Sequence, residues 1–204
     1  VGNAALGQDG VTICPVNLAA LAAVIAQGGI YQKPCIIKEI REHESKVVKH
    51  TENQAPRRVL PPHVAKELQE MMELAVADGT GKRAQIQGLG SAGKTGSAET
   101  GREDNQGKPV VDSWFVGYAP LENPQLAIAI FVEGGGAGGD CAALLFKKII
   151  DDTLIGCHLP FFDPSFFYLT FVNSYIRSRP GIFSNKQRLL RGLFLFVHTL
   201  TLLV

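Results

Sequence analysis

The sequence predicts an α/β (α+β) fold in which helices flank an antiparallel sheet. Apolar residues recur at helical spacing in two segments of the first half and in one segment after residue 140. Three strand-like runs lie between the second and the third of these segments. Because the loops that join these runs are too short for crossover helices, the three strands are expected to form an antiparallel meander.

The first half of the chain predicts two helices and one strand. The first helix, Val16–Gln27, is rich in alanine and leucine and ends at two glycines. A strand is predicted at Cys35–Ile40, and the charged residues 41–58 are expected to form an irregular surface excursion. The second helix begins at Pro61-Pro62 and runs to about Ala77. Its helical spacing predicts a buried face made of Val64, Leu68, Met71, Met72 and Ala75.

The second half predicts three strands and a final helix. The first run, Ser91–Ala98, consists of small residues, and the second, Ser113–Ala119, is aromatic. The third, Leu126–Glu133, is a nearly continuous apolar run, which predicts a central strand. The polar residues 100–108 are expected to form a flexible turn between the first two strands, and the last helix is predicted at Ala142–Leu154.

Composition excludes some classes of protein and divides the chain in two. The 204 residues suffice for one domain, or for one domain with an appendage. A net charge of +1 gives no strong electrostatic argument for nucleic acid as a partner, and 46% hydrophobic residues exclude a wholly disordered chain. Residues 159–204, however, hold eight of the 11 phenylalanines, five basic residues and one acidic residue. This difference in composition predicts that the tail differs in structure from the rest of the chain.

The cysteines and histidines do not have the spacing of a metal site. The four cysteines are Cys14, Cys35, Cys141 and Cys157, and no pair forms a C-x-x-C motif. The five histidines are scattered along the chain. We therefore expect free, buried or half-buried thiols, and neither a metal nor a cofactor.

Residues 88–95 match the P-loop pattern G-x-x-x-x-G-K-[ST]. In that interpretation Lys94 would contact a terminal phosphate and Thr95 would bind magnesium. A P-loop must follow a buried apolar strand and begin a helix. Residues 81–87 are too polar for such a strand, and residues 96–101 contain two glycines and no apolar helical stripe. Nucleotide binding at Gly88–Thr95 is therefore the less favoured alternative.

The same residues favour a strand motif, Lys94-Thr95-Gly96-Ser97. K-T-G is one of three motifs of penicillin-interactive serine enzymes, beside S-x-x-K and S-x-N. On a strand edge, the Lys94 cation would offset a substrate carboxylate, and the hydroxyls of Thr95 and Ser97 would lie on one side. Gly96, without a side chain, would let a substrate approach the strand closely.

Several ordered blocks around this motif resemble class B penicillin-binding proteins over residues 1 to about 155. In chain order the blocks are Gly7-Gln8, Pro15 with the alanine-rich helix, Ala77–Ala84, Gly93–Glu99, Trp114–Pro120, Asn123–Ile130 and Gly134–Gly139. The resemblance implies a fold of the beta-lactamase/transpeptidase type. It also implies a bacterial cell-membrane protein with its catalytic domain on the outer face.

Members of this family are peptidoglycan D,D-transpeptidases, in which a serine attacks the D-Ala-D-Ala bond of a stem peptide and beta-lactams acylate the same serine. The resemblance implies that Lys94 supports the electrostatics and proton network of the site. Thr95 and Ser97 would bind the terminal carboxylate, and the Ser97 N–H would be one oxyanion-hole donor. The implied partners are stem peptides, beta-lactams and other cell-wall synthesis proteins.

The sequence departs from the family pattern at its nucleophile. The only S-x-x-K string, Ser91–Lys94, overlaps the strand motif, no S-x-N occurs, and Asp9 stands where the family commonly has glycine. We therefore expect residues 1–155 to be the C-terminal part of a transpeptidase domain that is inactive alone. A non-catalytic penicillin-binding-like interaction module is the alternative. The absent part would supply strands, so an uncovered sheet edge is expected.

The tail, residues 156–204, matches nothing in the family pattern. Three interpretations are an interfacial membrane-associating appendage, a helical extension packed on the domain, and translation of a non-native reading frame. The excess of phenylalanine and the near absence of acidic residues agree with the first and the third, and we favour the third.

Overall fold

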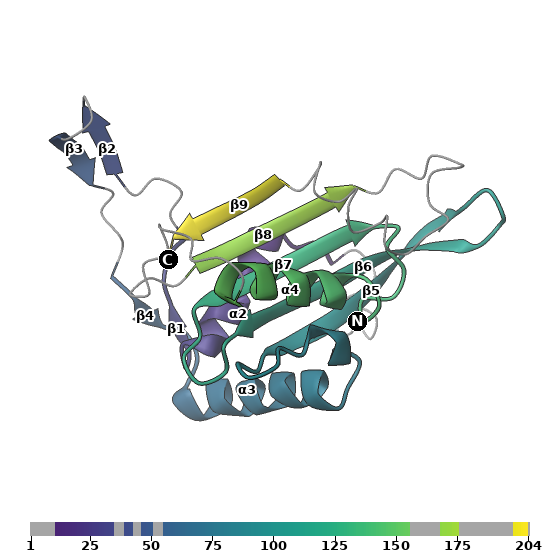
Figure 1. Ribbon diagram of the computed structural model, residues 1–204, viewed down its shortest axis with the longest axis horizontal. Helices are drawn as coiled ribbons and strands as arrows, with labels where there is room; N and C mark the ends of the chain where they lie inside the picture. The colour runs from purple at the N-terminus through teal and green to yellow at the C-terminus, as the bar shows by residue number, and fades with distance from the viewer. Residues whose placement is uncertain are drawn as a thin grey trace.

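The structure, a computed structural model, describes residues 11–34, 39–42, 46–50, 55–155, 168–175 and 198–203. A five-stranded sheet with the order β5-β6-β7-β8-β9 forms its centre (Figure 1). The strands are β5 Ala92–Glu103, β6 Pro109–Ala119, β7 Leu126–Glu133, β8 Tyr168–Tyr175 and β9 His198–Leu203. Helix α4, Ala142–Ile150, covers one face of the sheet, and helix α2, Pro15–Ala26, covers the other (Figure 1).

The predicted antiparallel meander is confirmed, because β5 pairs with β6 and β6 with β7 in antiparallel register. β5 and β6 are longer than predicted and extend into residues 100–108 as a hairpin. At its tip, Asp104 accepts the backbone N–H groups of Gln106 and Lys108 at 2.8 and 3.0 Å. These hydrogen bonds, that from Lys108 first, hold the pKa of Asp104 below its usual value. The polar run is therefore a structured turn on long strands.

The three predicted helices are confirmed, with α3 at Pro62–Ala77 and a π-helical turn, Asp151–Ile155, continuing α4. The predicted buried face of α3 is wrong at Met71, which is 63% exposed, whereas Met72 is buried. Adjacent helical residues lie about 100° apart around the axis, so only one of the two methionines faces the domain. Within the described ranges, no helix has both the length and the apolar character needed to cross a bilayer.

The region between α2 and α3 contains more strand than predicted. β2 Glu39–Glu42 and β3 Lys46–His50 form an antiparallel pair. β1 Ile30–Tyr31 also pairs with β4 Arg57–Arg58. The expectation of an irregular excursion is therefore wrong, because the β-branched Val47-Val48 lies among the charges. Residues 35–38 of the predicted strand Cys35–Ile40 lie outside the described residues.

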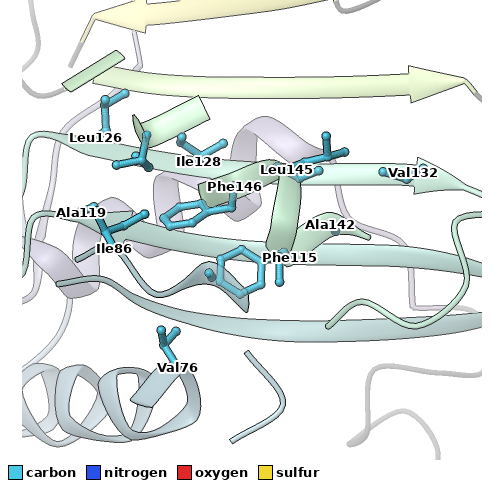
Figure 2. Packing of buried hydrophobic residues seen from close by; sticks show 14 residues of the cluster. Val76, Ile86, Phe115, Ala119, Leu126, Ile128, Val132, Ala142, Leu145 and Phe146 are labelled. Carbon is cyan, nitrogen blue, oxygen red and sulfur yellow. The ribbon is translucent and has the colours of Figure 1, made fainter. Parts of the chain in front are cut away.

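The main hydrophobic core lies between α4 and the sheet (Figure 2). Phe115 of β6 and Phe146 of α4 are fully buried, with ring centroids 4.8 Å apart. This separation and the 51° interplanar angle suit aromatic rings in direct contact. The other buried members are Val76, Ala84, Ile86, Ala119, Leu126, Ile128, Ile130, Val132, Ala142, Ala143, Leu145 and Ile150.

The opposite face of the sheet is built from small residues. Ala127 and Ala129 of β7 are fully buried against the α2 side, in a cluster with Ala92, Tyr118 and the alanines of α2. Short side chains on both surfaces let the helix approach the sheet closely. β7 is thus buried from both sides, which confirms its prediction as a central strand.

The described part of the tail extends the sheet. β8 pairs with β7 in parallel register, and β9 pairs with β8 in antiparallel register (Figure 1). β7 is therefore not an uncovered edge, because its outer backbone groups pair with β8; β5 is an edge strand of the sheet in the described part of the chain. The described tail residues are strands, so the helical alternative does not apply to them.

Burial of Tyr118 predicts a loss of stability at alkaline pH. Desolvation, with the charge of Glu73 second, raises the pKa of this phenol to about 12. In the unfolded chain the phenol ionises near pH 10. The contribution of Tyr118 to the free energy of unfolding is therefore fully present below that pH and is lost as the pH rises towards 12. The shift corresponds to at most about 2–3 kcal/mol.

Tyr118→Phe should remove this loss. Urea unfolding of both proteins between pH 8 and 12 measures it, and phenolate absorbance follows the ionisation directly. Equal alkaline slopes in the two proteins would show that Tyr118 is not the group responsible.

Candidate active site

Lys94, Thr95, Gly96 and Ser97 all lie on β5, an edge strand of the sheet in the described part of the chain. Thr95 and Ser97 face the α4 side, as their contacts with the loops on that side show. Lys94 and Gly96 alternate to the other face, where a Cβ on Gly96 would meet the Trp114 Cβ at 3.2 Å. The predicted strand and the predicted alternation are both confirmed.

Lys94 presents its charge at the surface of this edge. Its side chain is exposed, and its Nζ donates a hydrogen bond to the Thr95 carbonyl oxygen at 2.7 Å. This hydrogen bond keeps the cation close to the backbone of Thr95. An anion lying along β5 would therefore meet a positive charge and two hydroxyls within one short segment.

Both hydroxyls are contacted by loops that lie far away in the sequence. The Thr95 hydroxyl is 2.6 Å from the hydroxyl of Thr80, in the turn that follows α3. The Ser97 hydroxyl oxygen accepts a hydrogen bond from the backbone N–H of Gly138 at 3.1 Å. Neither Thr80 nor Gly138 was predicted as a site residue, and the only sequence signal was their place in the blocks 77–84 and 134–139.

The loop that contains Gly138 packs directly on the backbone of the site. A Cβ on Gly138 would lie 2.3 Å from the Gly96 oxygen and 2.5 Å from the Trp114 oxygen. A Cβ on Gly139 would lie 2.4 Å from the Thr80 oxygen. Real Cβ contacts are not this short, so glycine is required at both positions for the loop to reach the strand.

Ser113, which the sequence prediction missed, forms hydrogen bonds with the loop that contains Gly138. It lies on β6 directly opposite Ser97 and is fully buried. Its Oγ donates to the Ala137 oxygen at 3.3 Å and accepts the N–H of Ala142, the first residue of α4, at 3.2 Å. One hydroxyl thus satisfies groups on both sides of Gly138.

Neighbouring charged and nucleophilic groups support the loops and offer no rival chemistry. Arg83 pairs with Asp140 at 3.2 Å, which joins the two loops at their exposed ends, where an ion pair contributes little. Burial, with the charge of Asp140 second, raises the pKa of the Cys141 thiol, so it stays protonated at neutral pH. Among the described residues, no group of His, Cys, Asp and Glu side chains could hold a metal ion.

The P-loop interpretation is wrong. Gly88 and Gly90 have φ angles of +82° and +67° and form a turn, and Lys94 and Thr95 lie within a strand and not at a helix N-terminus. Ser91, the serine of the only S-x-x-K string, is 3% exposed, and its Oγ donates to the Ala84 oxygen at 2.7 Å. A buried hydroxyl committed to a carbonyl is not available as a nucleophile.

The edge strand, its hydroxyls and the two supporting loops define an α+β domain with a K-T-G strand. The family model described as penicillin binding protein transpeptidase domain matches residues 1–151. The chain therefore belongs to the penicillin-binding protein transpeptidase domain family.

Individual relatives agree with the family. The chain is 32% identical over 155 residues to the peptidoglycan D,D-transpeptidase PbpA of Mycolicibacterium smegmatis, covering 74% of this chain and 31% of that protein. It is 31% identical over 157 residues to the stage V sporulation protein D of Bacillus subtilis, covering 74% of this chain and 24% of that protein. The chain thus spans a third or less of the length of these relatives.

Solved structures show the same fold. The imipenem acyl-enzyme complex of penicillin-binding protein A from Mycobacterium tuberculosis matches with a TM-score of 0.63 and 30% identity. This match covers 75% of the present chain and 33% of that structure. A crystal structure described as the same protein also matches with a TM-score of 0.63 and 30% identity, covering 75% and 35%. The prediction of a beta-lactamase/transpeptidase-type fold is confirmed.

The close packing of Gly138 gives a testable prediction. Gly138→Ala should lower the free energy of unfolding by about 3 kcal/mol, because the new methyl group meets two backbone oxygens that cannot move aside. Gly101→Ala is the matched control, since its Cβ enters open space and its φ of +70° costs about 1 kcal/mol. Urea unfolding measures both, and a smaller loss for Gly138→Ala than for the control would contradict the packing.

Proposed function

We propose that this chain is the C-terminal part of a peptidoglycan D,D-transpeptidase domain, with stem peptides ending in D-Ala-D-Ala as substrates and beta-lactams as inhibitors. The observation that carries the proposal is the segment Lys94–Ser97 on an edge strand, which combines one cation with two hydroxyls on adjacent same-face positions. Family membership and relatives named as D,D-transpeptidases support it.

The geometry suggests how the substrate would bind. An extended peptide can lie beside an edge strand and use its unpaired backbone groups. In this position Thr95 and Ser97 would donate hydrogen bonds to the terminal carboxylate, and the charge of Lys94 would offset it. The Ser97 N–H would donate to the oxygen of the attacked carbonyl group, a type of contact worth about 3–4 kcal/mol of barrier. Because Gly96 has no side chain, the substrate could approach the strand closely at this position.

The proposed reaction requires a serine from the rest of the domain. Its oxygen would attack the carbonyl carbon of the D-Ala-D-Ala bond, the C–N bond would break, and D-alanine would leave with the serine proton. The amine of a neighbouring stem peptide would then displace the serine and restore its proton. Ser91 does not fill this role, because it is buried beside Ala84.

The proposed place of action is the outer face of a bacterial cell membrane, where the cell wall is assembled, with other cell-wall synthesis proteins as partners. Relatives named as peptidoglycan D,D-transpeptidases support cell-wall synthesis as the setting. We propose a boundary near residue 155, between the transpeptidase part, 1–155, and the phenylalanine-rich tail, 156–204. The family match, which ends at residue 151, supports this boundary.

Ser97→Ala tests the proposed carboxylate contact in the complete transpeptidase domain that contains this chain. Because a hydrogen bond to a charged group contributes about 1.5–3 kcal/mol, the rate constant for acylation by a fluorescent penicillin should fall roughly ten- to hundredfold. Glu99→Gln is the control, since Glu99 is exposed two residues further along β5 and should leave the rate unchanged. An unaltered rate for Ser97→Ala would exclude Ser97 from the site.

The purified chain of residues 1–204 should form no covalent adduct with the same penicillin, because the serine of its one S-x-x-K string, Ser91, is buried and hydrogen-bonded to the Ala84 oxygen. Gel fluorescence and intact mass measure the adduct. A stable adduct on the chain alone would overturn the expectation of inactivity. No adduct on the complete domain would instead favour the non-catalytic interaction module.

A further inference from the structure

Thr80 lies outside the hydrophobic core, yet its hydroxyl contacts the hydroxyl of Thr95. Thr80 is exposed, in the turn between α3 and the short 3-10 helix Lys82–Ala84, yet its Oγ1 is 2.6 Å from the Thr95 Oγ1. A backbone hydrogen bond holds the turn, because the Gly81 N–H donates to the Ala75 oxygen at 2.9 Å. The exposed ion pair of Lys82 and Asp78, at 2.8 Å, adds little. A fixed turn presents the Thr80 hydroxyl to Thr95.

The direction of this hydrogen bond follows from the proposed substrate. A threonine hydroxyl has one hydrogen to donate and two lone pairs to accept, whereas a carboxylate only accepts. To bind a carboxylate, Thr95 must spend its single hydrogen on it. In the bond at 2.6 Å, Thr80 is then the donor and Thr95 the acceptor.

Ser97 shows the same arrangement independently. Its oxygen accepts the Gly138 N–H at 3.1 Å, and a backbone amide can only donate. The hydrogen of Ser97 therefore also remains free for an acceptor. With Thr80 as the donor, a different loop contacts a lone pair of each hydroxyl, and both hydrogens remain available for an anion.

We propose that Thr80 is a positioning residue that makes Thr95 a hydrogen-bond donor and so sets the selectivity of the site for a carboxylate-terminated substrate. This inference rests on the proposed function. Donation from Thr80 holds the Thr95 hydroxyl in one orientation and polarises it, because hydrogen bonds in a chain strengthen one another. A ligand whose carboxylate is esterified lacks the charge that this polarised donor stabilises and gains less from it.

The test compares acylation of the complete transpeptidase domain by a penicillin and by its carboxylate methyl ester. Thr80→Val keeps the shape and removes the donor. It should lower the rate constant for the penicillin roughly three- to tenfold, through weaker initial binding, and change that for the ester less than twofold. Thr80→Ser should restore the penicillin rate, and Thr80→Ala, which adds no bulk, should repeat the loss of selectivity.

Thr100→Val is the matched control. Thr100 also lies on β5, and its hydroxyl donates to the Val110 oxygen at 2.8 Å in the hairpin, away from Lys94–Ser97. Its substitution should leave both rate constants unchanged. Thermal unfolding of each variant separates loss of folded protein from loss of binding.

Each outcome is decisive. If the unsubstituted complete domain is not acylated, the proposed function fails. If it is acylated and Thr80→Val slows penicillin and ester equally, or slows neither, the positioning role of Thr80 is overturned while the function stands. A selective loss for the penicillin, reversed by Thr80→Ser, establishes the role.

Discussion

The antiparallel register between β5 and β6 is the constraint on which the candidate site depends. It places Ser97 opposite Ser113, whose buried hydroxyl holds Ala137 and Ala142 on either side of Gly138. The Gly138 amide can therefore reach the Ser97 oxygen at 3.1 Å. A slip of one residue would turn every β5 side chain to the other face and separate these groups. The arrangement of donors around the hydroxyls exists only in this register.

The core opposes such a slip through the different sizes of residues on the two faces of β7. Ile128 and Ile130 lie in the cluster under α4, whereas Ala127 and Ala129 lie in the cluster under α2. Exchanging the faces would press large side chains against a helix packed for alanine and leave voids under α4, and both changes are destabilising. Burial of each large side chain contributes about 1.5–3 kcal/mol. The geometry of the exposed site is thus maintained by residues that never touch it.

The sequence predicted those parts of the site that depend on local periodicity. The strand at Lys94–Ser97 and the shared side of Thr95 and Ser97 follow from the two-residue repeat of a strand. The partners of these hydroxyls do not, because Thr80 and Gly138 are 15 and 41 residues away from them. Helical spacing likewise predicted the apolar residues of α3, but Met71 and Met72 have equal hydrophobicity, and only the packed domain decides which one is buried.

The string Gly88–Thr95 shows why residue types alone do not specify the chemistry. A P-loop works because successive backbone amides converge at a helix N-terminus and point at one phosphate. Here the chain enters β5 after Gly90, and amides of an extended strand point alternately to its two edges. In the proposed site the converging donors would instead be the side-chain hydroxyls of Thr95 and Ser97. The turn that carries Thr80 and the loop that carries Gly138 contact these hydroxyls, so a strand that is to bind an anion would need such loops to orient its side chains.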